Sequence, residues 1–218
     1  MGLADVATSL NKLTIPALAS VVVLGSLLNV PSSYFSNSRN VFNVYFIKMG
    51  WMWLTLLYAT HYSIPTSYGY RDQSRKSSVV IAIQYLIYSF FWFALTSSFD
   101  TMYFGSCSVS SFSSPRECHV SGNTWGGIDI SGHAFLIVFS SLIMLKIAKD
   151  RIPANNANDI VKYFTYFFIF VRCLWIIMLF FTFAHFHTFH DKILGVSFAA
   201  LCFLLTEKLM DSKMFKNM

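Results

Sequence analysis

Long apolar stretches alternate with short polar segments along the whole chain. Six stretches are apolar enough and long enough to cross the ~30 Å hydrocarbon core of a bilayer, which takes about 20 helical residues. They run approximately over residues 13–30, 42–63, 78–98, 131–147, 161–184 and 189–206. The last stretch is the shortest, so a five-span arrangement with a re-entrant final segment is the alternative. The pattern predicts an all-α polytopic membrane protein with six transmembrane helices, forming a single domain over residues 1–218.

Two features of the polar segments refine this picture. Segments 64–77 and 148–160 connect spans, with Pro65 and Pro153 marking breaks, while segment 99–130 is a long loop. The first residues lack the basic region, short apolar core and small-residue cleavage site of a signal peptide. We therefore expect the first apolar stretch to be retained as a span.

Composition supports a membrane protein and excludes a nucleic-acid binder. Soluble domains carry about a quarter charged residues, whereas this chain is 12% charged and 55% hydrophobic. The net charge of +6 comes from basic residues that form no long run and lie between apolar blocks. We therefore expect membrane lipids as partners and no nucleic acid.

The basic residues that flank the stretches predict the orientation. With both termini and the second and fourth connecting segments in the cytosol, eleven lysines and arginines lie on that side and three on the other. Because cytosolic loops carry the excess of Lys and Arg, both termini are predicted to be cytosolic. The cytosolic set is Lys12, Arg71, Arg75, Lys76, Lys146, Lys149, Arg151, Lys162, Lys208, Lys213 and Lys216, and the opposite set is Arg39, Arg116 and Lys192.

Two basic residues, Lys48 and Arg172, fall inside predicted spans. A charge at membrane depth usually faces a bundle interior, a partner or a water-filled cavity. Lys48 lies about two turns into its span and can also reach the interface by extending its side chain. Arg172 lies near the middle of the fifth span, where such extension is harder.

The four cysteines divide between spans and loop. Cys173 and Cys202 lie within spans, where they are expected to pack as apolar residues. Cys107 and Cys118 both lie in the long non-cytosolic loop, where an oxidising compartment would allow a disulfide. Metal binding is the weaker alternative, because the chain has no Cys-x-x-Cys spacing. We therefore expect no metal site and no cofactor.

A first candidate site lies where the long loop meets the fourth span. Ser131 is a candidate N-cap residue, and Gly132 would permit close approach of the backbone. A helix N-terminus offers N–H groups and a positive dipole end, which suit phosphate. His133, placed there, can donate a proton to a leaving oxygen. A plain interfacial histidine beside a cap serine is the structural alternative.

A second candidate site lies between the fifth and sixth spans. His187 and Asp191 are four residues apart, so on a helix they would share a face and the carboxylate could orient the imidazole. Two spans separate this segment from His133, so both segments are predicted to lie on one side of the membrane in either orientation. Together they could serve phosphoryl transfer, with His187 attacking phosphorus and His133 protonating the leaving group.

At these residues the chain resembles the fat-storage-inducing transmembrane (FIT) family of the endoplasmic reticulum. The resemblance covers about a third of the chain, and its most specific part is the Asp-x-Ser-Gly-His-x-Phe-Leu block. The matching stretches are Ser33 to Lys48 (SYFSNSRNVFNVYFIK), Gly105 to Cys107 (GSC), Cys118 with the following histidine, Trp125 to Ile137 (WGGIDISGHAFLI) and His187 to Gly195 (HTFHDKILG).

The resemblance implies an activity and a cellular role. The family is similar to lipid phosphate phosphatases, onto whose Ser-Gly-His and His-x-x-x-Asp motifs Ser131, Gly132, His133, His187 and Asp191 map. The implied reaction is metal-independent cleavage of fatty acyl-CoA to acyl 4'-phosphopantetheine and adenosine 3',5'-bisphosphate on the lumenal side. The implied role is lipid-droplet formation and lipid balance in the endoplasmic reticulum.

The chain departs from the phosphatase pattern in its cations. The Lys-x6-Arg-Pro motif is absent, and the arginine expected six residues before the second histidine is replaced by Phe181. The remaining phosphate-binding candidates on that side are Arg39, Lys48 and Lys192. Trp125 and Phe135 are candidates to border the mouth of the site.

Three other functions stay open on the sequence. The first is a phosphatase for phosphatidic or lysophosphatidic acid. The second is a non-enzymatic membrane protein that binds neutral lipids such as diacylglycerol and triacylglycerol. The third, a transporter lined by Lys48 and Arg172, is weaker because the sequence shows no inverted repeat.

Overall fold

A computed structural model describes residues 2–28, 30–37, 39–72, 77–99, 101–109, 111–186 and 188–212. His187, the predicted nucleophile, lies outside these residues. So do Arg75, Lys76, Lys213 and Lys216 and the side chains of Arg71 and Arg116, which entered the orientation count. The structural account of the second candidate site therefore rests on the residues that flank His187.

The described part of the chain is mostly helical, and five of its helices are long and apolar enough to span a membrane. They are α1 (Leu3–Leu27), α3 (Ser78–Phe99), α5 (Gly132–Asp150), α6 (Asp159–His185) and α7 (Phe189–Met210). Each corresponds to one predicted stretch. Helix α7 is continuous over 22 residues, so it does not support the re-entrant alternative.

Helix α1 begins well before the predicted start at residue 13. Asn11 and Lys12 interrupt the apolar pattern there. Asn11 and Thr14 are nevertheless buried in the bundle, because both hydrogen-bond to the guanidinium of Arg172 in α6. The polar positions thus lie inside a helix that the hydrophobic pattern alone cuts short.

The second predicted stretch, residues 42–63, is not one continuous helix. A π-helix, η2 (Phe42–Ile47), ends at Lys48, and α2 (Gly50–Ser63) follows with only 14 residues, a length of about 21 Å. The indole Nε1 of Trp53 donates to the carbonyl of Tyr45 across the break, at 2.8 Å. Helix α2 alone is therefore too short to cross a bilayer.

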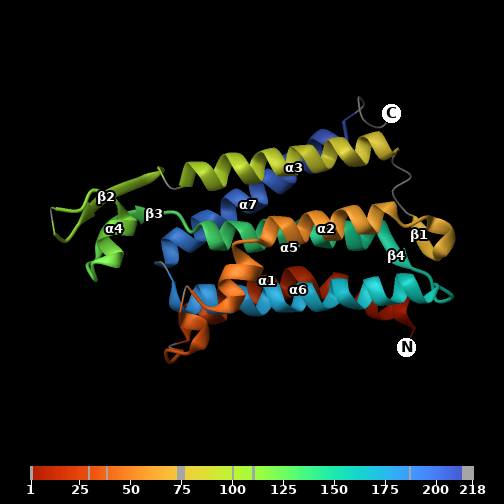
Figure 1. The fold of residues 1–218 in the computed structure, drawn as a ribbon, viewed down its shortest axis with the longest axis horizontal. Helices are drawn as coiled ribbons and strands as arrows, with labels where there is room; N and C mark the ends of the chain where they lie inside the picture. Colours follow the sequence, from red (N-terminus) through yellow and green to blue (C-terminus); the bar gives the residue numbers. More distant parts are fainter. Residues whose placement is uncertain are drawn as a thin grey trace.

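The helices run roughly along the long axis of the molecule (Figure 1). Both termini lie at one end, together with β1 (Tyr70–Asp72) and β4 (Arg151–Pro153); we call this the termini end. At the other end lie β2 (Tyr103–Cys107), α4 (Pro115–Val120), β3 (Trp125–Asp129) and the turn between α6 and α7. We call this the hairpin end.

Two short antiparallel ladders depart from the all-α prediction. At the termini end β1 pairs with β4, with Tyr70 opposite Pro153. At the hairpin end β2 pairs with β3, with Tyr103 opposite Asp129 and Cys107 opposite Trp125. Short 3-10 turns, η1 (Tyr34–Ser36) and η3 (Thr66–Tyr68), complete the described elements. The ladders order the segments that lie outside the long helices.

Helix α5 lies at the centre of the bundle. About two thirds (67%) of the residues in its apolar 18-residue stretch are buried, against 44% or less in the corresponding stretches of the other four long helices. A helix that is apolar on all sides belongs inside a bundle. A Cβ on Gly50 would lie 2.7 Å from the Leu136 side chain, so this glycine lets α2 pack closely against α5. The N-terminus of α5, with His133, is thereby fixed at the hairpin end.

Candidate active site at the hairpin end

Helix α5 begins as the sequence predicts. Ser131 is its N-cap residue and is fully buried, and its hydroxyl accepts a hydrogen bond from the Ala134 N–H at 3.3 Å. His133 is the second residue of the helix and is partly exposed. No described part of the chain approaches Gly132 closely, because a Cβ there would meet the Phe99 ring at 4.0 Å. The approach of a ligand to this backbone stays a prediction.

Helix α7 begins with a capping box. Thr188 is the N-cap residue, and its hydroxyl and backbone N–H both donate to the Asp191 carboxylate, at 2.7 and 3.2 Å. The helix therefore begins at Phe189, after the position of His187 in the chain. The Asp191 carboxylate serves as the N3 partner of this cap. Its relation to His187, which lies outside the described residues, stays a prediction.

Asp191 also joins the two candidate segments. Its side chain accepts a hydrogen bond from the Asp129 N–H at 2.9 Å, and its backbone carbonyl accepts one from the Ser131 N–H at 3.1 Å. The carboxylate is 3% exposed. The strand that leads into α5 is thus bonded directly to the first turn of α7, which confirms that the two segments lie on one side.

Gly195 allows the first turns of α5 and α7 to touch. A Cβ at this position would lie 2.5 Å from the carbonyl oxygen of Ser131 and 3.1 Å from the backbone nitrogen of Phe135. Both contacts are with backbone, which cannot move aside as a flexible side chain can. A close approach of two helix backbones is therefore found at Gly195. It brings the positive ends of two helix dipoles together at the hairpin end.

A cavity of about 360 Å³ opens beside this junction. It lies between β3, the C-terminal end of α6 and the first turn of α7, so both candidate segments contribute to it. Trp125 borders the cavity as expected. Phe135 does not, because it is fully buried in the core. His133 is not part of the described lining of the cavity. The lining residues are Trp125, Gly127, Asp129, His185, Phe186, Thr188 and Asp191.

Comparison with known proteins decides the family. The model of the family described as "Fat storage-inducing transmembrane protein" matches residues 31–107 and 99–162, which is more than half of the chain. The chain belongs to this family. The match covers β3 and the start of α5, and thus the first of the two segments that meet at the cavity. No solved structure matches the chain.

Several curated members of the family are similar to the chain over most of its length. It is 30% identical to the human protein named acyl-coenzyme A diphosphatase FITM2 over 209 residues, which is 85% of this chain and 77% of the human protein. The zebrafish protein of that name is 30% identical over 211 residues, 89% and 82% of the two chains. The Drosophila protein of that name is 31% identical over 149 residues, but the match spans only 35% of its length.

The residue that replaces the phosphatase arginine in this FIT-family chain has a packing role. Phe181 stacks on Phe35 of η1, with ring centroids 4.4 Å apart, and on His185, at 6.1 Å. The rings of Phe35, Phe181 and His185 thus connect the segment from Ser33 to Lys48 to the cavity. An arginine at position 181 would lose this stacking.

His185 is a cavity residue that sequence reasoning passed over. Its Nε2 atom is buried and has no hydrogen-bond partner among the described residues. A buried polar atom usually has a partner, so this nitrogen is available to a ligand that enters the cavity. The sequence feature that could have indicated His185 is its position two residues before His187, in a His-x-His sequence.

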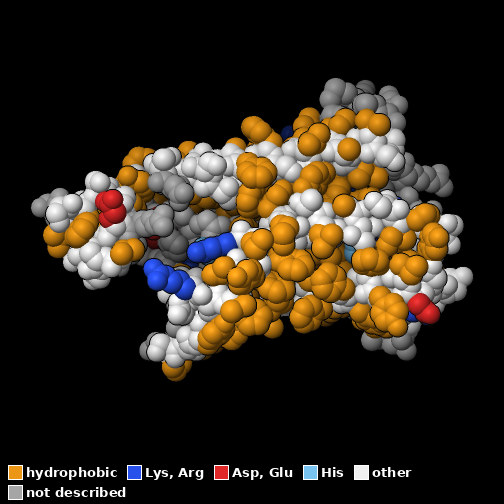
Figure 2. Space-filling model, viewed as in Figure 1, with side chains coloured by type: hydrophobic (Ala, Val, Ile, Leu, Met, Phe, Trp, Pro, Cys, Tyr) orange, Lys and Arg blue, Asp and Glu red, His pale blue; other side chains and the backbone are white. Residues whose placement is uncertain are grey.

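The three predicted phosphate-binding cations differ in the structure. Lys192 is 6% exposed, and its ammonium donates to the Phe183 carbonyl at 2.7 Å, so it holds the end of α6 rather than facing the cavity mouth. Arg39 and Lys48 are exposed. Figure 2 shows basic side chains between the apolar surface and the hairpin end on one face of the molecule. Neither exposed cation belongs to the described lining of the cavity.

A disulfide holds the outer part of the site together. Cys107 and Cys118 are bonded, with their Cα atoms 5.7 Å apart, and Cys107 lies opposite Trp125 in the β2–β3 ladder. The bond therefore ties α4 to the strand pair that carries Trp125. Within the described ranges, no group of three or more His, Cys, Asp and Glu side chains could hold a metal ion.

Proposed function

We propose that this chain is a fatty acyl-CoA diphosphatase. It hydrolyses the diphosphate of fatty acyl-CoA to give acyl 4'-phosphopantetheine and adenosine 3',5'-bisphosphate. The curated relatives that match most of the chain carry the name acyl-coenzyme A diphosphatase. The observation that carries the proposal is the cavity at which the strand leading to His133 and the residues on both sides of His187 meet.

The two histidines carry the chemistry. The His187 imidazole attacks one phosphorus of the diphosphate, the bond from that phosphorus to the bridging oxygen breaks, and His133 protonates the departing oxygen. Water, deprotonated by His133, then attacks the phosphohistidine and releases the second product with His187 restored. No redox partner or metal ion takes part. Asp191 is a positioning residue that joins the two segments and does not touch the reacting atoms.

Phosphate binding in this mechanism relies on helix ends. The first turns of α5 and α7 lie side by side, and a helix N-terminus stabilises anions through its N–H groups and dipole. This pair supplies positive potential that the missing Lys-x6-Arg-Pro motif would otherwise provide. Arg39 and Lys48, both exposed, add long-range attraction for the adenosine 3'-phosphate and the diphosphate.

Trp125 favours acyl-CoA over phosphatidic acid. Its indole borders the cavity and is held by a hydrogen bond from Nε1 to the Phe104 carbonyl at 3.4 Å and by edge contact with Tyr103. An aromatic ring fixed in this way can stack on a nucleobase, which is worth about 1–3 kcal/mol. Phosphatidic acid has no base to stack. We therefore place the adenine against Trp125.

The membrane arrangement follows from the charge count. We propose six crossings, with η2 and α2 together forming the second, both termini in the cytosol and the hairpin end in the lumen of the endoplasmic reticulum. The eleven-to-three distribution of basic residues supports the orientation. The disulfide supports an oxidising compartment for the hairpin end. In this membrane the activity would serve lipid balance and lipid-droplet formation, beside diacylglycerol and triacylglycerol.

The decisive experiment compares purified wild type with His133→Ala and His187→Ala. Acyl-CoA hydrolysis should fall by about 10²–10⁴-fold in each variant, because each loses a proton-transfer or nucleophilic group. The matched control is His190→Ala, which replaces an exposed histidine in the first turn of α7 and should retain activity. Products identified by mass spectrometry establish the cleaved bond. Wild-type turnover that persists in both variants would contradict the proposal.

The same preparation separates the alternatives. An enzyme for acyl-CoA turns it over faster than phosphatidic acid, and Trp125→Leu lowers only the acyl-CoA rate. A lipid phosphate phosphatase shows the reverse order and is indifferent to Trp125. A non-enzymatic lipid-binding protein supports droplet formation in cells equally well as wild type and as His187→Ala.

A further inference from the structure

Arg172 lies near the middle of the membrane-spanning bundle. It is 13 residues from each end of α6 (Asp159–His185), or about 20 Å from either end at 1.5 Å per residue. Its side chain is 7% exposed. The active-site cavity lies at the C-terminal end of the same helix, so the proposed hydrolysis makes no use of this arginine.

The partners of the guanidinium are neutral. One terminal nitrogen, Nη1, donates to the Asn11 side-chain oxygen at 2.8 Å, and the other, Nη2, donates to the hydroxyl of Thr14. The Phe168 ring lies 5.9 Å from the guanidinium carbon. The salt bridges formed among the described residues involve Lys146 and Lys162 but not Arg172. A cation buried at this depth without a countercharge is costly.

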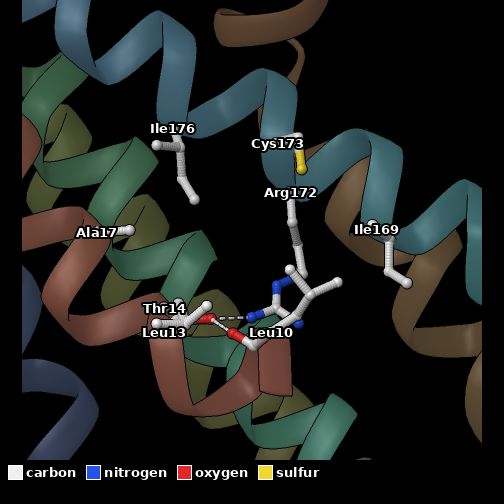
Figure 3. A pocket seen from close by; sticks show the side chains of 8 residues that line it. All are labelled: Leu10, Leu13, Thr14, Ala17, Ile169, Arg172, Cys173 and Ile176. Carbon is white, nitrogen blue, oxygen red and sulfur yellow. Dashed lines mark hydrogen bonds between the residues drawn. The ribbon is translucent and has the colours of Figure 1, made fainter. Parts of the chain in front are cut away.

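A small groove opens over this cation from the outer surface of α1 and α6. Apolar side chains flank it on both helices, and the guanidinium reaches across its base from α6 to α1 (Figure 3). Its volume is about 70 Å³, and Leu13 and Cys173 on its rim are exposed on the helix surfaces. In a bilayer these surfaces face lipid. The lining residues are Leu10, Leu13, Thr14, Ala17, Ile169, Arg172, Cys173 and Ile176.

We propose that this groove binds the carboxylate of a long-chain fatty acid that enters sideways from the bilayer. A guanidinium has five N–H donors in a planar fork that matches a carboxylate, and among the described residues Asn11 and Thr14 accept from two of them. The acid supplies the missing negative charge. Its hydrocarbon chain lies along the apolar surfaces of α1 and α6.

Depth excludes the charged head groups of phospholipids. A phospholipid phosphate stays at the interface, whereas Arg172 is about 20 Å from either end of α6. A fatty acid can reach the midplane because it crosses as the neutral acid. On binding it gives its proton to a water molecule, which carries it to bulk solvent, and the carboxylate that remains pairs with the guanidinium.

The test uses the full chain in nanodiscs and a photoactivatable, diazirine-bearing palmitic acid. Labelling is mapped by mass spectrometry to peptides of α1 and α6 and is competed with unlabelled palmitic acid or its methyl ester. Wild type should be labelled in the groove, and the acid should compete at least tenfold better than the ester. Equal competition by acid and ester would overturn the proposal, because it would indicate a neutral-ester site without charge recognition.

Variants separate binding from folding. Arg172→Gln keeps hydrogen-bonding capacity and removes the charge, so labelling should fall about tenfold, whereas Arg172→Lys should retain most of it. Lys162→Gln removes an exposed charge from the same helix and is the matched control. If Arg172→Gln does not fold, Ala17→Phe fills the groove with the arginine intact and should also abolish labelling. Undiminished labelling of Arg172→Gln or Ala17→Phe would contradict a carboxylate site.

Discussion

The Asp191 carboxylate accepts a hydrogen bond from the Asp129 backbone N–H, 2.9 Å away, across 62 residues of sequence. This bond connects the strand that leads to His133 with the helix that follows His187. The Asp191 side chain thus holds two chain segments together at the site, and its predicted effect on the His187 imidazole stays a prediction.

Replacing Asp191 should therefore reduce stability together with activity. Asp191→Ala leaves the Asp129 and Thr188 donors without their partner, which costs about 1–3 kcal/mol of unfolding free energy. Asp191→Asn keeps an acceptor oxygen and should lie between Asp191→Ala and wild type. Thermal unfolding in detergent measures both effects.

The control is Asp159→Ala, an exposed carboxylate in the first turn of α6 whose solvent-screened salt bridge to Lys162 contributes little to stability. The pH dependence of kcat should keep its shape in Asp191→Asn. A shifted pH profile at unchanged stability would show that Asp191 acts on a catalytic imidazole after all.

Gly195→Ala should push α5 and α7 apart at the site. Alanine in a helix interior normally stabilises by about 0.5–1 kcal/mol relative to glycine. Here the added Cβ would lie 2.5 Å from the Ser131 carbonyl, and such overpacking costs about 1–3 kcal/mol. Gly132→Ala, whose Cβ meets only Phe99 at 4.0 Å, is the matched control for stability. Equal unfolding temperatures of the two variants would contradict the close approach.

Removing the disulfide should weaken substrate binding more than it slows chemistry. The double change Cys107→Ser and Cys118→Ser frees α4 from the strand that pairs with Trp125, so the ring is less well fixed. KM for acyl-CoA should rise several-fold, with a smaller change in kcat. Cys173→Ala, which alters a free cysteine far from the hairpin end, should leave both constants unchanged. A fall confined to kcat would show that the bond supports the histidines instead.

Glycosylation can report on which side of the membrane the hairpin end lies. Gly122→Asn creates an Asn-Asn-Thr acceptor at residues 122–124, in an exposed turn where φ is +76° and a Cβ meets nothing within 4 Å. Asparagine tolerates this conformation better than most residues. In microsomes the variant should gain one glycan that endoglycosidase removes. An acceptor tag after Met218 should stay unmodified, and the opposite pattern would reverse the proposed orientation.

Much of the fold could be predicted from the sequence because long apolar stretches are a strong signal. Ser131 was found as a cap for a similar reason: a small hydroxyl residue stood just before an apolar run. Other features carried weaker signals. The start of α1 was missed because Asn11 and Lys12 interrupt the apolar pattern, whereas the burial of Asn11 depends on its hydrogen bonds to Arg172 of α6 and to the Ala148 carbonyl of α5. The break between η2 and α2 contains no proline, so the sequence carries no local signal that predicts it.

The candidate site shows how one pattern can support two structures. Thr188 and Asp191 form a Thr-x-x-Asp sequence ahead of an apolar run, which is the signature of a capping box. The same aspartate lies four residues after His187, which suggested a shared helix face. The cap forms because it satisfies backbone N–H groups that the start of α7 would otherwise leave unpaired. The stacking of Phe181 on Phe35 joins distant segments and had no local signal.

The short helix α2 has a consequence for the surrounding lipid. In the proposed six-span arrangement α2 supplies about 21 Å of a ~30 Å hydrocarbon core, so η2 and the exposed Lys48 lie in the remaining part of this crossing. A charged side chain at this depth draws water and head groups inward and thins the bilayer locally. The π-helical part of this crossing lies towards the hairpin end, so the thinned leaflet would be the one from which the substrate comes. A shallower leaflet there shortens the distance that a coenzyme A head group must cover while its acyl chain remains in lipid.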